Sequence, residues 1–155
     1  YQPEAVDLRL IMGIYKIVSD LERIGDEAEN IAERSILLAQ EPPLKPYVNL
    51  TLMASNVKTM IEDAVLSFFQ RDVELAKKVI ERDDMVDELY HQVQRELITY
   101  MLEDPRNIKR AIHLSFVARH FERMADHAEN IAEMTIYWSE GEMVKHQHIK
   151  EKEMH

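Results

Sequence analysis

The feature of this sequence that most restricts its fold is a twelve-residue segment that occurs twice, 100 positions apart. ERIGDEAENIAE starts at Glu22 and ERMADHAENIAE starts at Glu122, with nine of the twelve positions identical. At about 100° per residue, a helix places the acids of each copy within an arc of roughly 60°. The repeat therefore predicts two long helices with one carboxylate stripe each, formed by Glu22, Asp26, Glu29 and Glu33 and by Glu122, Asp126, Glu129 and Glu133.

The two stripes can be interpreted in two ways. Acids at intervals of three and four are common on the solvated face of a helix. Such faces usually intersperse lysine or arginine, because like charges at this spacing repel by about 0.2–0.5 kcal/mol per pair. The first stripe has no such partner, and the second has only Arg119 nearby. The stripes therefore favour a bound hard cation held by oxygen ligands, such as Mg, Ca, Mn or Fe.

Composition narrows the class of protein. With 46% hydrophobic and 31% charged residues, the 155-residue chain is typical of folded globular proteins. The absence of cysteine excludes disulfides and thiolate-bound zinc. The net charge of -10 argues against nucleic acid as a ligand, since phosphate binding needs a basic surface. No apolar run approaches the roughly 20 residues that span a bilayer.

Apolar residues at intervals of three and four predict an all-α fold of four helices. Asp72 and Asp104 are suitable N-caps for the third and fourth helices, and Gly141 is expected to end the fourth. Residues 45–140 then form an antiparallel, up-down three-helix bundle, followed by a polar tail at 141–155 that is a frayed helical extension or disordered. The long N-terminal helix, within residues 1–41, either packs on this bundle as a fourth helix or pairs with another copy of the chain.

Asp83 interrupts an apolar seam of the third helix, and Asp84 and Asp87 flank it. A rotated helix would expose all three acids to water. Alternatively, Asp83 and Asp87 face the second stripe, because a buried carboxylate is costly unless it is neutralised or coordinated. In that arrangement they complete a metal site with Glu122, Asp126 and Glu129.

Histidines are the other candidate ligands. His113, His120 and His127 recur every seven residues and share a helix face, which suggests a metal site or a pH sensor. We favour the interpretation that they edge the core and are satisfied by neighbours. Glu88 and His91 form an E-x-x-H pair, which is half of the pattern used by di-iron bundles. No nucleophile with a base and no phosphate-binding glycine loop is present, so enzymatic activity is not expected.

Both copies of the repeat, with the preceding Asp20-Leu21 and Asp7-Leu8-Arg9, resemble the PhoU family of phosphate-signalling regulators. The resemblance implies two three-helix bundles, of which the first is truncated here, so that residues 1–41 supply its third helix. The chain would then be a C-terminal fragment or a partly described protein. The family's acid-x-x-x-Asp metal pattern maps onto Glu22 with Asp26 and onto Glu122 with Asp126. The metal ligands expected from motif and spacing together are Glu22, Asp26, Glu29, Asp83, Asp87, Glu122, Asp126 and Glu129.

By the same resemblance, the chain is expected to be a cytoplasmic, non-enzymatic adaptor. It would link the ATPase of a phosphate ABC transporter to a sensor histidine kinase, reaching the membrane through these partners only, and repress the phosphate-starvation response. The expected cofactors are divalent or ferric ions (Fe, Mn, Mg or Zn), and the expected assembly is a homo-oligomer. The alternative is a di-metal carboxylate bundle, a ferritin-like oxidase or storage protein, and a third possibility is an interaction bundle without metal.

Overall fold

The protein is helical throughout the part of the chain that the structure, a computed structural model, describes. This part comprises residues 3–44 and 47–153, with side chains for 8–44 and 47–141, and it contains no strand. The all-α prediction is confirmed. The elements are α1 (Pro3–Leu38), α2 (Val48–Gln70), α3 (Val73–Glu103), a short 3-10 helix η1 (Pro105–Asn107) and α4 (Ile108–Glu153).

Of the two predicted N-caps, Asp72 caps its helix as expected, whereas Asp104 caps a short 3-10 helix and α4 begins only at Ile108. The backbone of Arg71 adopts a left-handed conformation (φ 53°) that ends α2. Asp72 follows, and its side chain accepts a hydrogen bond of 3.0 Å from the Leu75 amide, so α3 begins at Val73. Asp104 accepts a hydrogen bond of 2.9 Å from the Arg106 amide and caps η1, with Pro105 in the first turn.

The predicted end of α4 is wrong, because Gly141 does not stop the helix. A glycine ends a helix when it adopts a left-handed conformation, and no glycine in the described chain has a positive φ. An interior glycine costs only about 1 kcal/mol relative to alanine. Gly141 also lies next to α1, since a Cβ at this position would be 3.9 Å from Arg9 Nη1. The segment 141–153, expected to be a frayed helical extension or disordered, continues α4 as a helix; residues 154–155 lie outside the described part.

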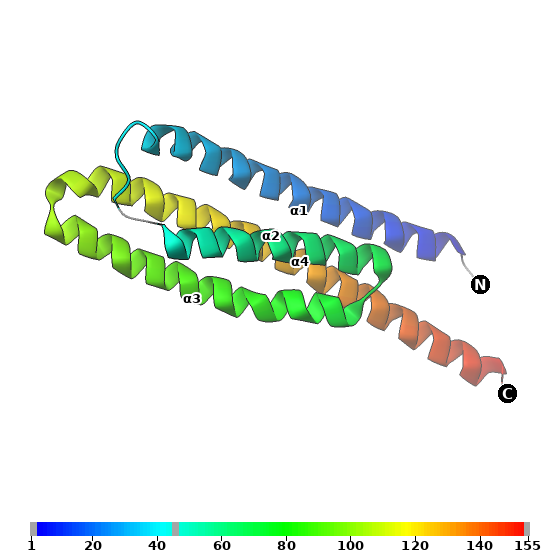
Figure 1. The fold of residues 1–155 in the computed structure, drawn as a ribbon. Coiled ribbons are helices and arrows are strands. Elements are labelled where there is room, and N and C mark those ends of the chain that lie inside the picture. Colours follow the sequence, from blue (N-terminus) through cyan, green and yellow to red (C-terminus); the bar gives the residue numbers. More distant parts are fainter. Residues whose placement is uncertain (1–2, 45–46, 154–155) are drawn as a thin grey trace.

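Helices α2, α3 and α4 form the expected up-down bundle, with α3 antiparallel to both neighbours (Figure 1). Its core is built at the apolar positions that the helical periodicity selected. Ala76, Val79, Val86, Val93 and Leu97 of α3 are all buried. The residues with the largest fully buried side chains are Met53, Met60, Val57, Val79, Val86 and Ile131.

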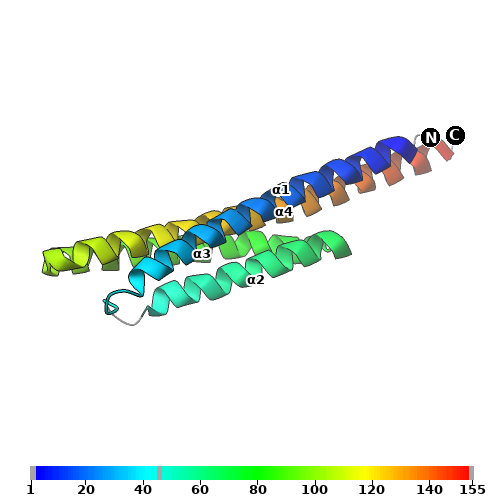
Figure 2. The ribbon, with the colours of Figure 1, turned by 90° about the horizontal axis from the view of Figure 1, so that it is seen from above.

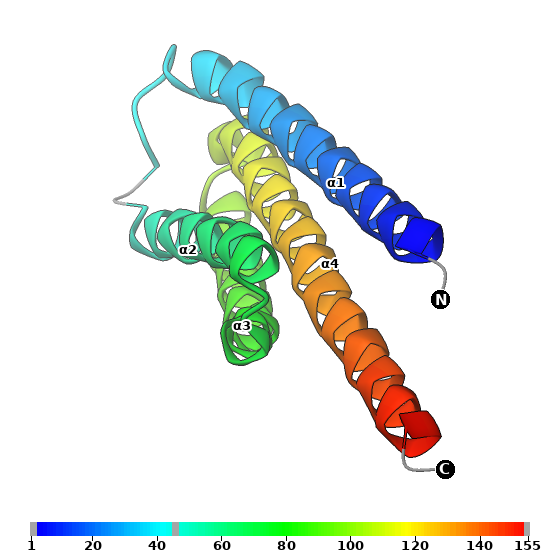
Figure 3. The ribbon, with the colours of Figure 1, turned by 90° about the vertical axis from the view of Figure 1, so that its right-hand side faces the viewer.

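The N-terminal helix α1 packs mainly against α4, and the Phe68 side chain of α2 also approaches α1 at Gly13. Figure 3 shows α1 on one side of α4 and the α2–α3 pair on the other, and Figure 2 shows α1 and α4 side by side along their length. Only the α4-facing side of α1 is buried, at Gly13, Ile17 and Ile24. Of the two arrangements expected for this helix, the structure has the packed one. Its outer face exposes large apolar side chains, namely Leu8, Ile11, Met12, Ile14, Tyr15, Val18 and Leu21.

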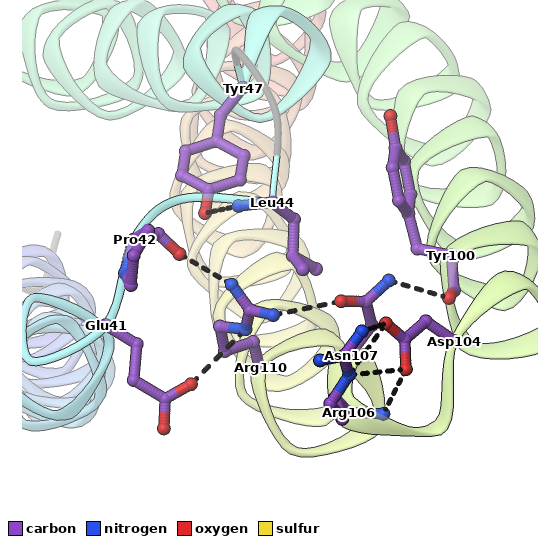
Figure 4. Close-up of polar contacts among 9 residues, drawn as sticks. All are labelled: Glu41, Pro42, Leu44, Tyr47, Tyr100, Asp104, Arg106, Asn107 and Arg110. Carbon is purple, nitrogen blue, oxygen red and sulfur yellow. Dashed lines mark hydrogen bonds and ion pairs between the residues drawn. The ribbon is translucent and has the colours of Figure 1, made fainter.

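One arginine joins the two loops at the end of the bundle where α4 begins (Figure 4). The Arg110 guanidinium donates hydrogen bonds to the Pro42 carbonyl (2.8 Å) and to Asn107 Oδ1 (2.9 Å). Its Nε lies 3.3 Å from Glu41 Oε2. Asn107 in turn donates to the Tyr100 carbonyl at the end of α3 (3.1 Å). Arg110 therefore connects the segment after α1 to the α3–η1 turn.

Candidate metal centre

The only candidate metal-binding group in the described part of the chain lies between α3 and α4. One carboxylate oxygen each from Asp83, Asp126 and Glu129 can be chosen so that all three atoms lie within 4.8 Å of one another. Asp83 is on α3 between buried Val79 and Val86, which turns it toward α4. Asp126 and Glu129 are three residues apart on α4 and therefore project from one face. Of the five ligands expected here, Asp83, Asp126 and Glu129 come together, whereas Asp87 and Glu122 are not part of this group; that the group binds a metal stays a prediction.

The Asp83 carboxylate lacks a full set of partners. Its Oδ1 atom is buried and has no hydrogen-bond partner in the described chain. A buried, unsatisfied polar oxygen costs on the order of 1–3 kcal/mol, and more when it is charged. A cation between Asp83 and the two α4 carboxylates would satisfy this oxygen.

Burial and mutual repulsion raise the pKa values of the α4 carboxyls. The pKa of Glu129 rises to about 8, first because of desolvation and then because the Asp83 side chain hydrogen-bonds to its protonated form. The pKa of Asp126 rises to about 6, again first through desolvation and then through the charges of Glu122, Asp83 and Asp87. Both groups therefore resist ionisation when no cation is present.

Two further carboxyls belong to the same electrostatic group. Desolvation raises the pKa of Asp87, and the charge of Asp83 adds to the effect. Desolvation also raises the pKa of Glu122, followed by the charges of Asp87 and Asp83. We refer to Asp83, Asp87, Glu122, Asp126 and Glu129 as the α3–α4 acidic cluster.

Positive side chains offset the α3–α4 acidic cluster only in part. Arg119 and Arg123 lower the pKa of Glu122, but the net direction remains upward. His127 lowers the pKa of Asp126 with the same outcome. The cluster therefore keeps an excess of negative charge. Its all-oxygen donor set suits Mg, Ca, Mn or Fe.

The first copy of the repeat forms no such cluster. Glu22, Asp26 and Glu29 are exposed on α1 and belong to no candidate metal group in the described part of the chain. The reason is that α1 packs mainly against α4, and among the described residues no acid of a second helix joins the first stripe in such a group. Gly25 illustrates the difference: its counterpart Ala125 is fully buried, whereas a Cβ on Gly25 would meet open space. These three residues remain predicted ligands without partners from a second helix.

The three heptad-spaced histidines edge the interface between α1 and α4 and are satisfied by neighbours, as we favoured. His120 Nδ1 lies 2.5 Å from Glu27 Oε2, and His127 Nδ1 lies 3.0 Å from Asp20 Oδ1. His113 Nδ1 lies 3.0 Å from Arg34 Nη1. These partners on α1 were not predicted. Asp20, Glu27 and Arg34 have the same spacing of seven residues, which marks them as candidates, but the spacing does not show which faces of α1 and α4 meet.

The E-x-x-H pair of the di-metal alternative lies away from the α3–α4 acidic cluster. Glu88 and His91 are both exposed on α3. Neither residue joins a candidate metal group among the described residues. The geometry therefore gives no support to a site inside the bundle built on this pair.

The raised pKa values predict that the folded protein loses stability as the pH rises. A carboxyl whose pKa is higher in the folded state keeps its proton longer there, so the free energy of unfolding falls between the unfolded and folded pKa values. This interval runs from 3.8 to about 6 for Asp126, and from 4.5 to about 8 for Glu129. In EDTA, we expect these groups to lower the melting temperature progressively between about pH 4 and about pH 8.

Asp83→Asn tests this pH dependence. It leaves the desolvation in place but removes the Asp83 charge, which further raises the pKa values of Glu129, Asp126 and Asp87. The melting temperature of the variant, followed by circular dichroism across the same pH range, is expected to fall less steeply than that of the wild type. Parallel pH profiles of the two proteins would contradict the prediction.

Comparison with known proteins gives consistent matches. The family model described as "PhoU domain" matches residues 1–35 and 50–135. The chain is 78% identical over 152 residues to the "Phosphate-specific transport system accessory protein PhoU homolog" of Aquifex aeolicus, covering 98% of this chain and 69% of that protein. It is 51% identical to the protein of the same name from Deinococcus radiodurans, covering 91% and 66%. The chain thus spans about two thirds of the length of these relatives.

Two solved structures share the fold. The crystal structure of PhoU from Pseudomonas aeruginosa superimposes with a TM-score of 0.85 at 45% identity, covering 91% of this chain and 68% of that one. That of the phosphate transport system regulatory protein PhoU from Streptococcus pneumoniae gives 0.80 at 28% identity, covering 90% and 66%. Among the described residues, none of the helices combines the length and apolar character needed to cross a membrane.

Proposed function

This chain belongs to the PhoU family, and on that premise we propose that it regulates a phosphate transport system without catalysing a reaction. The observation that carries the proposal is the 78% identity to a phosphate-specific transport system accessory protein over nearly the whole chain. The identity spans both copies of the acidic repeat. The helical bundle and the lack of a nucleophile–base pair in the sequence agree with an accessory role.

We further propose that the α3–α4 acidic cluster binds a hard cation and that the cation-bound form of the protein is the active one. Asp83, Asp126 and Glu129 would hold the ion, and Glu122 and Asp87 would add charge around it. The supporting observation is the buried, unpartnered Asp83 Oδ1 atom beside two carboxyls whose pKa values are raised. When bound, the ion would neutralise the repulsion among these carboxyls and fix α3 against α4. Fe, Mn, Mg, Ca and Zn are all candidates.

The finer part of the proposal concerns the partners. The protein would contact the ATPase subunit of a phosphate ABC transporter and a sensor histidine kinase, and signal to the kinase that phosphate is sufficient. The family resemblance suggests these partners. The exposed apolar face of α1 agrees with a protein that makes further contacts, including contacts between copies of the chain.

The regulatory role is tested by deleting the gene that encodes this chain in its own bacterium. A phosphate-responsive promoter fused to a reporter is expected to rise several-fold in phosphate-replete medium, because the repressing signal is lost. The wild-type gene should restore repression. The variant carrying Asp83→Asn and Asp126→Asn should restore it less, at equal protein level.

Pull-downs from phosphate-replete cells identify the partners in the same strains. Retention of the transporter ATPase and of the kinase is the expected result. A reporter that stays low after the deletion would contradict the regulatory role itself. Retention of neither partner, with a normal reporter response, would contradict only the adaptor mechanism.

A further inference from the structure

The interface between α1 and α4 contains a regular series of polar pairs, which we call the cross-helix ladder. Its three rungs are Asp20–His127, Glu27–His120 and Arg34–His113, with N···O or N···N distances of 3.0, 2.5 and 3.0 Å. Successive rungs are seven residues apart on both helices. The histidine Nδ1–H donates to the carboxylate in the first two rungs, and the Arg34 guanidinium donates to His113 in the third. No rung requires a charged histidine.

The rungs are enclosed within the interface. The side chains of Glu27 and His120 are 13% and 10% exposed, and those of Asp20 and His127 are 18% and 23% exposed. Ile17 and Ile24 are buried among the rungs on the same face of α1. The seam of α1 thus alternates apolar and polar layers with a heptad period.

Additional contacts hold the rungs in place from both sides. Asn130 Nδ2 donates to Asp20 over 3.5 Å, and Arg123 Nη1 lies 3.9 Å from Glu27 Oε1. The Arg34 guanidinium lies 4.0 Å from the centre of the Phe116 ring. In each rung, one further residue of α4 therefore contacts the α1 member of the pair and favours the native pairing.

Polar layers in a helix interface add little stability, but they select one alignment of the two helices. Replacing a buried polar pair by apolar residues is often neutral or stabilising, whereas a polar residue in an apolar heptad seam selects one register. A uniformly apolar α1 seam would allow the helix to slide by one heptad with little loss. The polar layers exclude this freedom.

Each one-heptad slip removes one rung of the ladder. Moved in one direction, Asp20 and Glu27 would still face histidines, but Arg34 would reach the position of Arg106, which lies in η1 before α4 begins and carries the same charge. Moved in the other direction, Asp20 would face Met134, and its carboxylate would have an apolar partner. Only the native register supplies a complementary partner to all three α1 residues.

We propose that the cross-helix ladder is a register lock, and that Asp20, Glu27 and Arg34 are positioning residues that fix where α1 lies along α4. The lock determines the axial offset between the two copies of the acidic repeat. It goes beyond the proposed regulatory function and needs no bound cation, so it can stand or fail independently of cation binding.

The absence of cysteine permits a direct measurement of register. Spin labels are attached to cysteines introduced at Lys16 of α1 and Lys109 of α4, which are exposed and lie far apart along the interface. The labelled wild type is expected to give one distance. With Asp20→Leu, Glu27→Leu and Arg34→Leu together, we expect a second population displaced by up to about 10 Å, the length of one heptad. Helix content is expected to be unchanged.

Two comparisons separate register from general packing. Arg23→Leu changes an exposed α1 residue off the ladder and should leave one distance. Glu27→His combined with His120→Glu reverses a rung and should also keep one distance. A single, unchanged distance in a folded triple-leucine variant overturns the proposal. If that variant does not fold, the double variant Asp20→Leu with Glu27→Leu is measured instead, and an unchanged distance overturns the proposal equally.

Discussion

Asp126→Ala is expected to abolish cation retention by the purified protein, whereas Asp26→Ala should leave it nearly unchanged. The two aspartates occupy the same position in the two copies of the repeat. Asp126 approaches Asp83 and Glu129 across the α3–α4 contact, whereas Asp26 belongs to no such group of carboxylates among the described residues. The pair is therefore a matched comparison of one residue type in two environments.

The thermodynamic consequence is large. A cation that binds only the folded state adds about 2.7 kcal/mol to the free energy of unfolding at a concentration 100 times its dissociation constant. Most of this gain should be lost in Asp126→Ala. Without cation, Asp126→Ala should be as stable as the wild type or more stable. The substitution removes one of the mutually repelling carboxylates, whose charge raises the pKa of Glu129.

Elemental analysis after purification without added metal, followed by melting curves with Mg, Ca, Mn, Fe and Zn, provides the measurement. Equal metal content in the two variants would contradict the α3–α4 site. A loss of stability in Asp126→Ala that is independent of cation would show a structural role for the carboxylate in place of ion binding.

Ile131→Ala is expected to destabilise the protein by about 2–5 kcal/mol, the range for deleting a large aliphatic side chain from a core. Ile131 is fully buried in the α2–α3–α4 core. Its counterpart Ile31 is only partly buried, on α1, which packs mainly against α4. Because less apolar surface and a smaller cavity are involved, Ile31→Ala should cost less than half as much.

The free energies of unfolding of the two variants are compared by urea denaturation, with one common slope of the free energy against urea concentration. It tests the packing asymmetry between the two copies without relying on any ligand. Similar losses in both variants would mean that α1 is enclosed as completely as α4, in conflict with the exposed outer face of α1.

The helices and their starts were predictable because they depend on nearby residues. Asp72 and Asp104 cap their helices through amides two or three residues away. The end of α4 was not predictable in this way. Whether Gly141 continues a helix depends on its surroundings, which here include Arg9 of α1.

The same distinction applies to the sites. Asp83 could be assigned to the α3–α4 acidic cluster because a carboxylate in an apolar seam is visible in one helix. The partners of His120 and His127 lie on a distant helix, and their assignment requires knowing which faces of α1 and α4 meet. The first acidic stripe was expected to bind metal by symmetry with the second, but the repeat supplies only one side of such a site.

Helix α4 packs against all three of the other long helices, α1, α2 and α3. Between His120 and Glu129 it presents the ladder histidines to α1, alanines to the core and acids to α3. Almost no part of its circumference in this segment is therefore free to vary. Apart from Glu27, which belongs to the cross-helix ladder, substitutions should therefore be tolerated more readily in the first copy of the motif than in the second, so that the two copies diverge at different rates.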